Sequence, residues 1–148
     1  MVQHKAESFC IADLSATTRL SGKVWPQHVA VYEKEIAAYY QLPDVFWPDA
    51  FIVRIDNKVV GFALIITSSL SHDACELCWV MTDPDYRQQG IGEALVNAAI
   101  SKASERQQTM FFSTFRPTLY QKLGLQPVGE WRPGRHYFIV HPKTLSKS

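Results

Sequence analysis

Residues 74–115 form the stretch that most limits how this chain can fold. ACELCWVMT at 74–82 is a long apolar strand pattern, and TMFFSTF at 109–115 is a second one. Between them, from Gly90 to about Arg106, apolar residues recur at helical spacing behind a turn that carries two glycines. Two strands joined through a helix form a crossover unit, and such a unit predicts an α/β fold with a layered sheet.

Shorter apolar segments surround this unit. Asp56 and Asn57 separate two β-branched runs and tolerate left-handed backbone angles, which predicts a tight hairpin. We expect further strands at 9–14, 50–55, 59–67, 125–131 and 136–141, and helices at 117–123 and within 17–41, interrupted near Gly22 and Pro26. The predicted architecture is a single α/β domain over residues 1–148, with a mixed, mostly antiparallel central sheet flanked by helices.

Charge and cysteine content narrow the function classes. The 148 residues carry 15 Lys and Arg against 14 Asp and Glu, without the basic excess that is typical of nucleic-acid binding. No apolar run approaches the roughly 18 residues that cross a membrane, and MVQHKAESF lacks the apolar region of a signal peptide. An odd count of 3 cysteines favours free thiols. We therefore expect a cytoplasmic protein without nucleic-acid or membrane partners.

The turn RQQGIG at 87–92 precedes the central helix. A helix start directs free N–H groups and a positive dipole end outward, and both favour an anion such as phosphate. Gly90 and Gly92 allow close approach of a bulky diphosphate, and Arg87 offers a positive charge. The chain has no GK[ST] of a P-loop, and Leu95 stands where the dinucleotide pattern needs its last glycine.

The same turn, Arg87-Gln88-Gln89-Gly90-Ile91-Gly92, matches the R/Q-x-x-G-x-G/A loop of the GNAT superfamily of N-acetyltransferases. The segments DPDYRQQGIGEALV, TLYQKLGL and KVVGFALI also resemble segments of that family, and the order of the expected elements is similar to that of the family from Phe9 to His141. The resemblance implies acetyl transfer from acetyl-CoA to a primary amine, by direct attack in a ternary complex. Two alternatives stay open for the whole chain: a non-catalytic acyl-CoA-binding regulatory module, and an interaction domain without a cofactor.

The resemblance also implies roles for single residues. The backbone at Val80, Met81 and Thr82 is expected to hold the pantetheine arm and to polarise the thioester carbonyl. Residues 87–92 are expected to hold the pyrophosphate. Tyr120, in LYQKLGL, is expected to be the general acid for the leaving thiolate, and Ser113 occupies the position of a pantetheine-binding asparagine.

Glu76 is the candidate general base. It is the only acidic residue in ACELCWVMT, and strand alternation predicts that it shares one face with Cys78, Val80 and Thr82. A carboxylate among apolar neighbours is suited to accept a proton. Deprotonation through water is the alternative, as is a solvated Glu76 paired with Lys or His72.

Cys75 and Cys78 form a CxxC pattern, but residues three apart on a strand point to opposite faces, so no metal site is expected. Aromatic residues in the early part of the chain, Trp25 and Tyr39 among them, are candidates for an acceptor pocket. Together with near-neutral charge they favour a small-molecule amine, with a protein or peptide amine as the alternative. The family also suggests a homodimer through the final strands.

Overall fold

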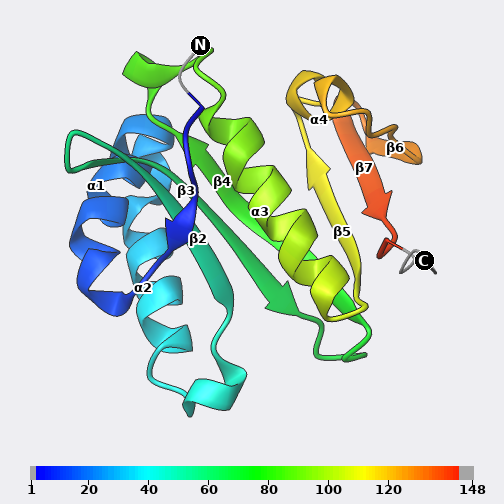
Figure 1. Cartoon of the computed structure of the whole chain (residues 1–148), viewed down its shortest axis with the longest axis horizontal. Coiled ribbons are helices and arrows are strands. Elements are labelled where there is room, and N and C mark those ends of the chain that lie inside the picture. Colours follow the sequence, from blue (N-terminus) through cyan, green and yellow to red (C-terminus); the bar gives the residue numbers. More distant parts are fainter. Residues whose placement is uncertain (1–2, 144–148) are drawn as a thin grey trace.

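The computed structural model describes residues 3–143, which form a central sheet with helices on both faces (Figure 1). The strands are β1 (Glu7–Ser8), β2 (Asp49–Ile55), β3 (Lys58–Thr67), β4 (Ala74–Thr82), β5 (Thr109–Thr114), β6 (Gly129–Arg132) and β7 (Arg135–Val140). The helices are α1 (Leu14–Val24), α2 (Val29–Tyr39), α3 (Ile91–Glu105) and α4 (Thr118–Lys122). No helix within residues 3–143 is long and apolar enough to cross a membrane.

The strand order is β1-β2-β3-β4-β5-β7-β6. Every neighbouring pair is antiparallel except β4 and β5, which run parallel because α3 connects them. The predicted mixed, mostly antiparallel sheet is therefore confirmed. The β2–β3 hairpin turns at Asp56 and Asn57 with φ of 51° and 65°, as their tolerance of left-handed angles predicted.

Two apolar cores lie on opposite faces of the sheet. Helix α3 covers one face (Figure 1), where its residues Leu95 and Ala99 pack with Met110 and Phe112 of β5. On the other face α1 and α2 cover β2, β3 and β4, and the buried side chains there include Leu20, Tyr32, Ile36, Phe62 and Met81. Neither α1 nor α2 covers β5 and β7, so that half of the sheet keeps one face free of helix.

The predicted strand at 9–14 is wrong. The strand is Glu7–Ser8, and the chain then turns through a 3-10 helix at Ile11–Asp13 into α1. The Asp13 carboxylate accepts the Cys10 N–H at 3.0 Å and pairs with Arg54 at 2.6 Å. These contacts satisfy the start of a helix, so the apolar residues that looked like a strand become its first turn.

Two smaller corrections concern one later strand and the first long helix. The strand expected at 125–131 begins only at Gly129, because the Leu125 N–H bonds back to Tyr120 O at 3.1 Å as part of the turn that ends α4. Gly22 does not interrupt α1, which continues to Val24. The turn at 132–135 forms as expected, with Gly134 at φ +84°.

An ion cluster joins the end of β4 to α1. The Asp83 side chain is 1% exposed, and Lys23 Nζ donates to its two oxygens at 3.1 and 2.9 Å. Lys58 Nζ lies 3.7 Å from Asp83 Oδ2, and the Asp85 N–H donates a hydrogen bond to Asp83 Oδ1 at 2.9 Å. Burial acts to raise the pKa of Asp83, but the Asp85 N–H and the lysines outweigh it, so the pKa lies below its usual value.

Lys23→Met is expected to lower the free energy of unfolding at pH 7, because it leaves the more distant Lys58 as the remaining cation beside the buried Asp83 carboxylate. A lowered folded-state pKa stabilises above the unfolded value, and that contribution disappears as pH falls through the folded value. The deficit should therefore shrink below about pH 4. Urea unfolding at pH 7 and pH 3 measures it, with exposed Lys34→Met as the control. Equal losses for the two variants at pH 7 would contradict the role of Lys23.

Candidate active site

Strands β4 and β5 separate soon after they begin. They pair at Ala74↔Thr109, Cys75↔Met110 and Glu76↔Phe111, and within the described residues no later pair joins them. Figure 1 shows the two strands diverging toward the end of the sheet where α3 begins. The backbone of β4 from Leu77 onward therefore presents unpaired N–H and C=O groups to the split, as an exposed strand edge does.

A bulge interrupts β4 beside this split. Its register against β3 runs from Leu64↔Cys78 to Phe62↔Met81, so Trp79 and Val80 together face one residue of β3. Trp79 has φ +54°, which is rare for a bulky side chain. The bulge is therefore a constrained point of the strand.

The bulge corrects the prediction that Glu76, Cys78, Val80 and Thr82 share one face. Cys78 packs with the core under α1 and α2, whereas Val80 packs with the core under α3. An extra residue in one strand inverts the alternation that follows it. Glu76 and Cys78 thus face away from α3, and Val80 faces toward it. The expected opposite faces of Cys75 and Cys78 are confirmed.

The glycine turn lies at the open end of the split. Gly90 has φ +79°, and a Cβ placed there meets no atom within 4 Å. No backbone N–H between Arg87 and Glu93 donates a hydrogen bond within residues 3–143; the next, on Ala94, donates to Gly90 O at 3.0 Å. Free donors around an open, left-handed turn at a helix start form a cradle that suits a diphosphate.

Gly92 connects this cradle to the rest of the site. A Cβ there would lie 3.1 Å from Leu119 Cδ2 of α4 and 3.6 Å from Thr82 Oγ1 at the end of β4. The structure therefore brings the predicted residues 80–82 and 87–92 together with α4. Arg87 is exposed beside them.

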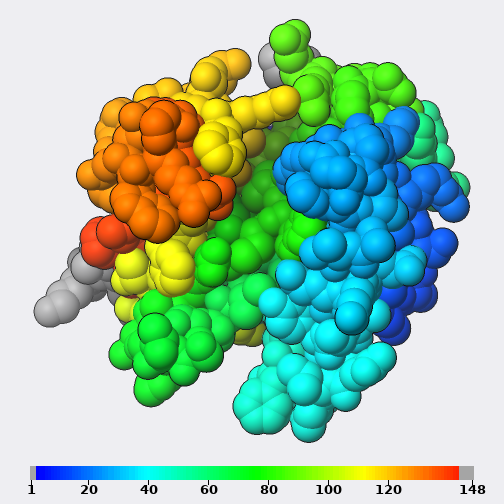
Figure 2. Space-filling view, turned by 180° about the vertical axis from the view of Figure 1, so that it is seen from behind, coloured from blue at the N-terminus to red at the C-terminus, as the bar shows by residue number. Residues whose placement is uncertain are grey.

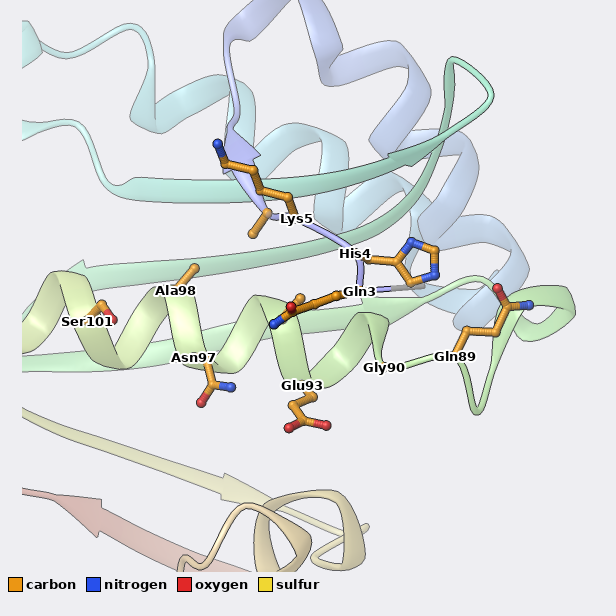
Figure 3. A pocket seen from close by; sticks show the side chains of 11 residues that line it. Gln3, His4, Lys5, Gln89, Gly90, Glu93, Asn97, Ala98 and Ser101 are labelled. Carbon is orange, nitrogen blue, oxygen red and sulfur yellow. The ribbon is translucent and has the colours of Figure 1, made fainter. Parts of the chain in front are cut away.

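A groove of about 710 Å³ extends from this turn along α3 (Figure 3). Residues 3–6 of the N-terminal segment border it on one side, and Gln89, Gly90, Glu93, Asn97 and Ser101 are among the residues on the other. Figure 3 shows Glu93 and Asn97 pointing away from the N-terminal segment. The groove continues the cradle along the helix, and its lining contains no residue of β5 or α4.

Tyr120 lies in the core between α4 and the sheet. It is 6% exposed, and its ring centre lies 4.6 Å from that of Phe112 and 5.5 Å from that of Phe138. Burial raises the pKa of Tyr120 to about 12, so its hydroxyl is protonated at neutral pH. Ser113 faces the opposite side of β5, and its Oγ accepts a hydrogen bond from Arg135 Nε at 2.9 Å.

The face of the sheet that carries Glu76 is hollowed. Figure 2 shows the hollow between α1 and α2 on one side and the β5–β7 region on the other, with β4 at its floor. Glu76 is exposed, and its register neighbours are apolar, Ile66 on β3 and Phe111 on β5, followed by Ile139 on β7. Phe111 and Ile139 are 39% and 45% exposed. The Glu76 carboxylate therefore lies among partly exposed apolar side chains on this face of the sheet.

The surroundings of Glu76 bear on the other candidates. His72 Nε2 lies 3.7 Å from Asp73 Oδ1, so the ionic partner of His72 is Asp73 and not Glu76 as suggested. Burial, followed by the nearby charges of Glu76 and Glu35, raises the pKa of Cys78 far above its ordinary value. Its thiol is therefore protonated at neutral pH and is a poor nucleophile.

Two residues of the site escaped the sequence analysis. Trp79 Nε1 donates to Glu35 Oε2 of α2 at 2.6 Å, and Trp25 and Tyr32 pack edge-on against the Trp79 ring. Glu35 stands beside Ile36 at the margin of the buried face of α2, which is a weak signal for such a contact. Nothing in the pattern of β4 itself marks the bulge.

A family model, "Acetyltransferase (GNAT) domain", matches residues 47–127. The match contains β2, the split between β4 and β5, the glycine turn and α4. This chain belongs to the GNAT acetyltransferase family. The membership inferred from the turn and from LYQKLGL is confirmed, and with it the class of acyltransferases.

Other proteins resemble this GNAT chain more distantly. An uncharacterized N-acetyltransferase of Methanocaldococcus jannaschii is 35% identical over 60 residues, which is 38% of this chain and 26% of that protein. The chain thus spans about a quarter of the length of this curated relative.

Solved structures share the fold over almost the full chain. An aminoglycoside 6'-N-acetyltransferase complexed with coenzyme A has TM-score 0.74 and 16% identity, over 99% of this chain and 100% of the other. The ribosomal-protein-S18-alanine N-acetyltransferase of Escherichia coli has TM-score 0.74 and 19% identity, over 98% and 97%. At such identities the likeness establishes a common GNAT architecture.

Proposed function

We propose that this GNAT chain is an acetyl-CoA-dependent N-acetyltransferase that acts on a primary amine of a small molecule. The observation that carries the proposal is the position of the glycine turn. Its free N–H groups lie at the open end of the split, beside the unpaired edge of β4. A diphosphate and an extended amide-containing arm need these two features next to each other.

The residues present suit acetyl-CoA. The turn at 87–92 would hold the pyrophosphate through its N–H groups, with Arg87 adding a charge-assisted contact. The backbone at Val80, Met81 and Thr82 would bind the pantetheine arm as an added strand. When bound, acetyl-CoA supplies an activated thioester. A coenzyme A complex of an aminoglycoside 6'-N-acetyltransferase with this fold supports the assignment.

Glu76 and Tyr120 take the proton-transfer roles in this proposal. Glu76 is open to solvent on the hollowed face and accepts the amine proton, directly or through water. Tyr120, on the α3 side of the sheet, keeps a proton on its hydroxyl for the leaving sulfur. The half-buried, protonated Cys78 thiol supports direct attack by the amine rather than a route through an acylated cysteine.

The acceptor would enter from the hollow in Figure 2. The exposed Glu76 carboxylate attracts an ammonium, and the neighbouring apolar side chains of Phe111 and Ile139 suit a carbon skeleton. The related folds include enzymes named for an aminoglycoside and for a ribosomal-protein alanine, so the acceptor screen includes both kinds of amine. A cytoplasmic location and a homodimer through β6 and β7 belong to the same proposal.

A thermal-shift titration with acetyl-CoA, coenzyme A and ADP tests the proposal first. A ligand that binds only the folded state, present at a hundred times its Kd, adds about 2.7 kcal/mol to the free energy of unfolding. This stabilisation gives a clear rise in Tm. A saturable rise with acetyl-CoA leads to a screen of small amines and peptides. No rise, in protein shown to be free of copurified coenzyme A, would remove the enzyme assignment.

Tyr120→Phe is expected to lower kcat roughly a hundred-fold, because it removes the proton donor for the leaving sulfur. The affinity for acetyl-CoA should change little, since the ring and its packing against Phe112 and Phe138 persist. Steady-state kinetics with direct titration of acetyl-CoA separates these effects. Tyr40→Phe, in the aromatic cluster near α2, is the control. An unchanged kcat in Tyr120→Phe would reject the acid role.

A further inference from the structure

The β4 bulge needs an external support. Trp79 has φ +54°, although Cys78 before it and Met81 after it pair with β3 in the usual way. A bulky aromatic residue seldom adopts this angle. Such a conformation persists only where the surroundings over-determine it. The support must reach Trp79 from outside β4.

Helix α2 provides that support from the hollowed face. Glu35 Oε2 accepts a hydrogen bond from Trp79 Nε1 at 2.6 Å, a short distance for a charge-assisted bond. The Tyr32 ring, on the same helix and fully buried, lies 5.3 Å from the Trp79 ring at 80°. The indole is thus held at its polar atom by Glu35 and packed against the Tyr32 ring.

The residues after the bulge depend on this arrangement. Because Trp79 adds a residue against β3, Val80 faces α3 and Met81 faces the core under α1 and α2. Without the bulge, Val80 and Met81 would each point to the opposite face of the sheet. The backbone N–H and C=O groups of β4 beside the split would then point in other directions. The Glu35–Trp79 contact therefore lies directly before the backbone at 80–82.

We propose that Glu35 is a positioning residue which, through the Trp79 indole, holds the β4 bulge so that the backbone of residues 80–82 is shaped to receive acetyl-CoA. This inference rests on the proposed function. It assigns Glu35 a task distinct from that of Glu76: Glu35 acts on the geometry of the donor site, and Glu76 faces the acceptor.

The test compares Glu35→Leu, Glu35→Gln and Trp79→Phe, with Glu33→Leu on the exposed side of α2 as the control. Loss of one hydrogen bond to a charged group corresponds to about a ten-fold rise in the Kd for acetyl-CoA, measured by calorimetry. Glu35→Leu and Trp79→Phe should each show it, and their double variant should show no more. Glu35→Gln keeps an acceptor oxygen and should stay within about three-fold of wild type. In kinetics, the KM for acetyl-CoA should rise more than kcat falls.

A second measurement uses the ligand-free protein. In NMR spectra Glu35→Leu should lose the exchange protection of the Trp79 indole N–H and shift the Val80 and Met81 amide resonances, whereas Glu35→Gln and Glu33→Leu should not. Unchanged resonances in Glu35→Leu, or an unchanged Kd, would overturn the inference. If wild type fails to bind acetyl-CoA, the proposed function and the ligand part of the inference both fall, and the resonances still decide whether Glu35 holds the bulge.

Discussion

Gly90→Glu is expected to weaken acetyl-CoA binding at least about a hundred-fold. Its side chain would enter the open space beside the turn, where no atom lies within 4 Å of the position of Cβ. A carboxylate about 4 Å from a diphosphate charge is repelled by roughly 4 kcal/mol at an intermediate dielectric, more than the 2.7 kcal/mol of a hundred-fold change. Calorimetric titration at fixed salt measures the effect.

Two further variants separate charge from backbone strain. Gly124, after α4, also has a positive φ, +85°, with open space around it, so Gly124→Glu introduces the same strain and charge away from the cradle. We expect it to lose stability without losing affinity. Gly90→Ala introduces strain alone and should reduce affinity far less than Gly90→Glu. Equal losses of affinity for Gly90→Glu and Gly124→Glu would show that the cradle does not hold the diphosphate.

Gly61→Val is expected to lower the free energy of unfolding by about 3 kcal/mol, because β3 and α3 meet there without room for a side chain. A Cβ at Gly61 would lie 2.6 Å from Ile91 Cγ2 and 2.9 Å from Leu95 Cδ1. For a domain of this size the loss corresponds to a fall in Tm of about 10 °C. Since Ile91 is the first residue of α3, its displacement should also weaken acetyl-CoA binding.

Matched variants test the steric origin of this loss. Gly129→Val, in the exposed strand β6 with no atom near its Cβ, should leave Tm almost unchanged. Gly61→Ala should cost less in an Ile91→Ala background than in wild type, because the clashing methyl group is then absent. If Gly61→Val and Gly129→Val shift Tm equally, the close approach of α3 to β3 is not what limits this position.

The features that were predicted correctly have local causes. The hairpin at Asp56 and Asn57 follows from the angles that these two residues tolerate, and α3 follows from apolar spacing behind a glycine turn. The strand 74–82 was found at its correct bounds because a continuous apolar run is a strong signal. The turn and LYQKLGL carried the family assignment, since those residues are read directly from the chain.

The features that were missed depend on partners far along the chain. The expected strand at 9–14 became a helix start because Asp13 pairs with Arg54, 41 residues later. Glu76 and Val80 lie on opposite faces because of the bulge at Trp79, which Glu35 and the neighbouring rings hold. The residue pattern of β4 does not predict this bulge. Each of these contacts exists only after the sheet and helices have packed.

The sequence by itself determined the strand–turn–helix–strand unit, the glycine turn at 87–92 and the family, because these depend on periodicity and on the backbone freedom of neighbouring residues. Only the tertiary structure decided where β4 leaves β5, which way its residues point after Trp79, and which face is left hollow. The physical reason is that strand pairing and helix cover are settled by contacts between distant segments, and a single added residue in a strand reverses every side chain that follows it.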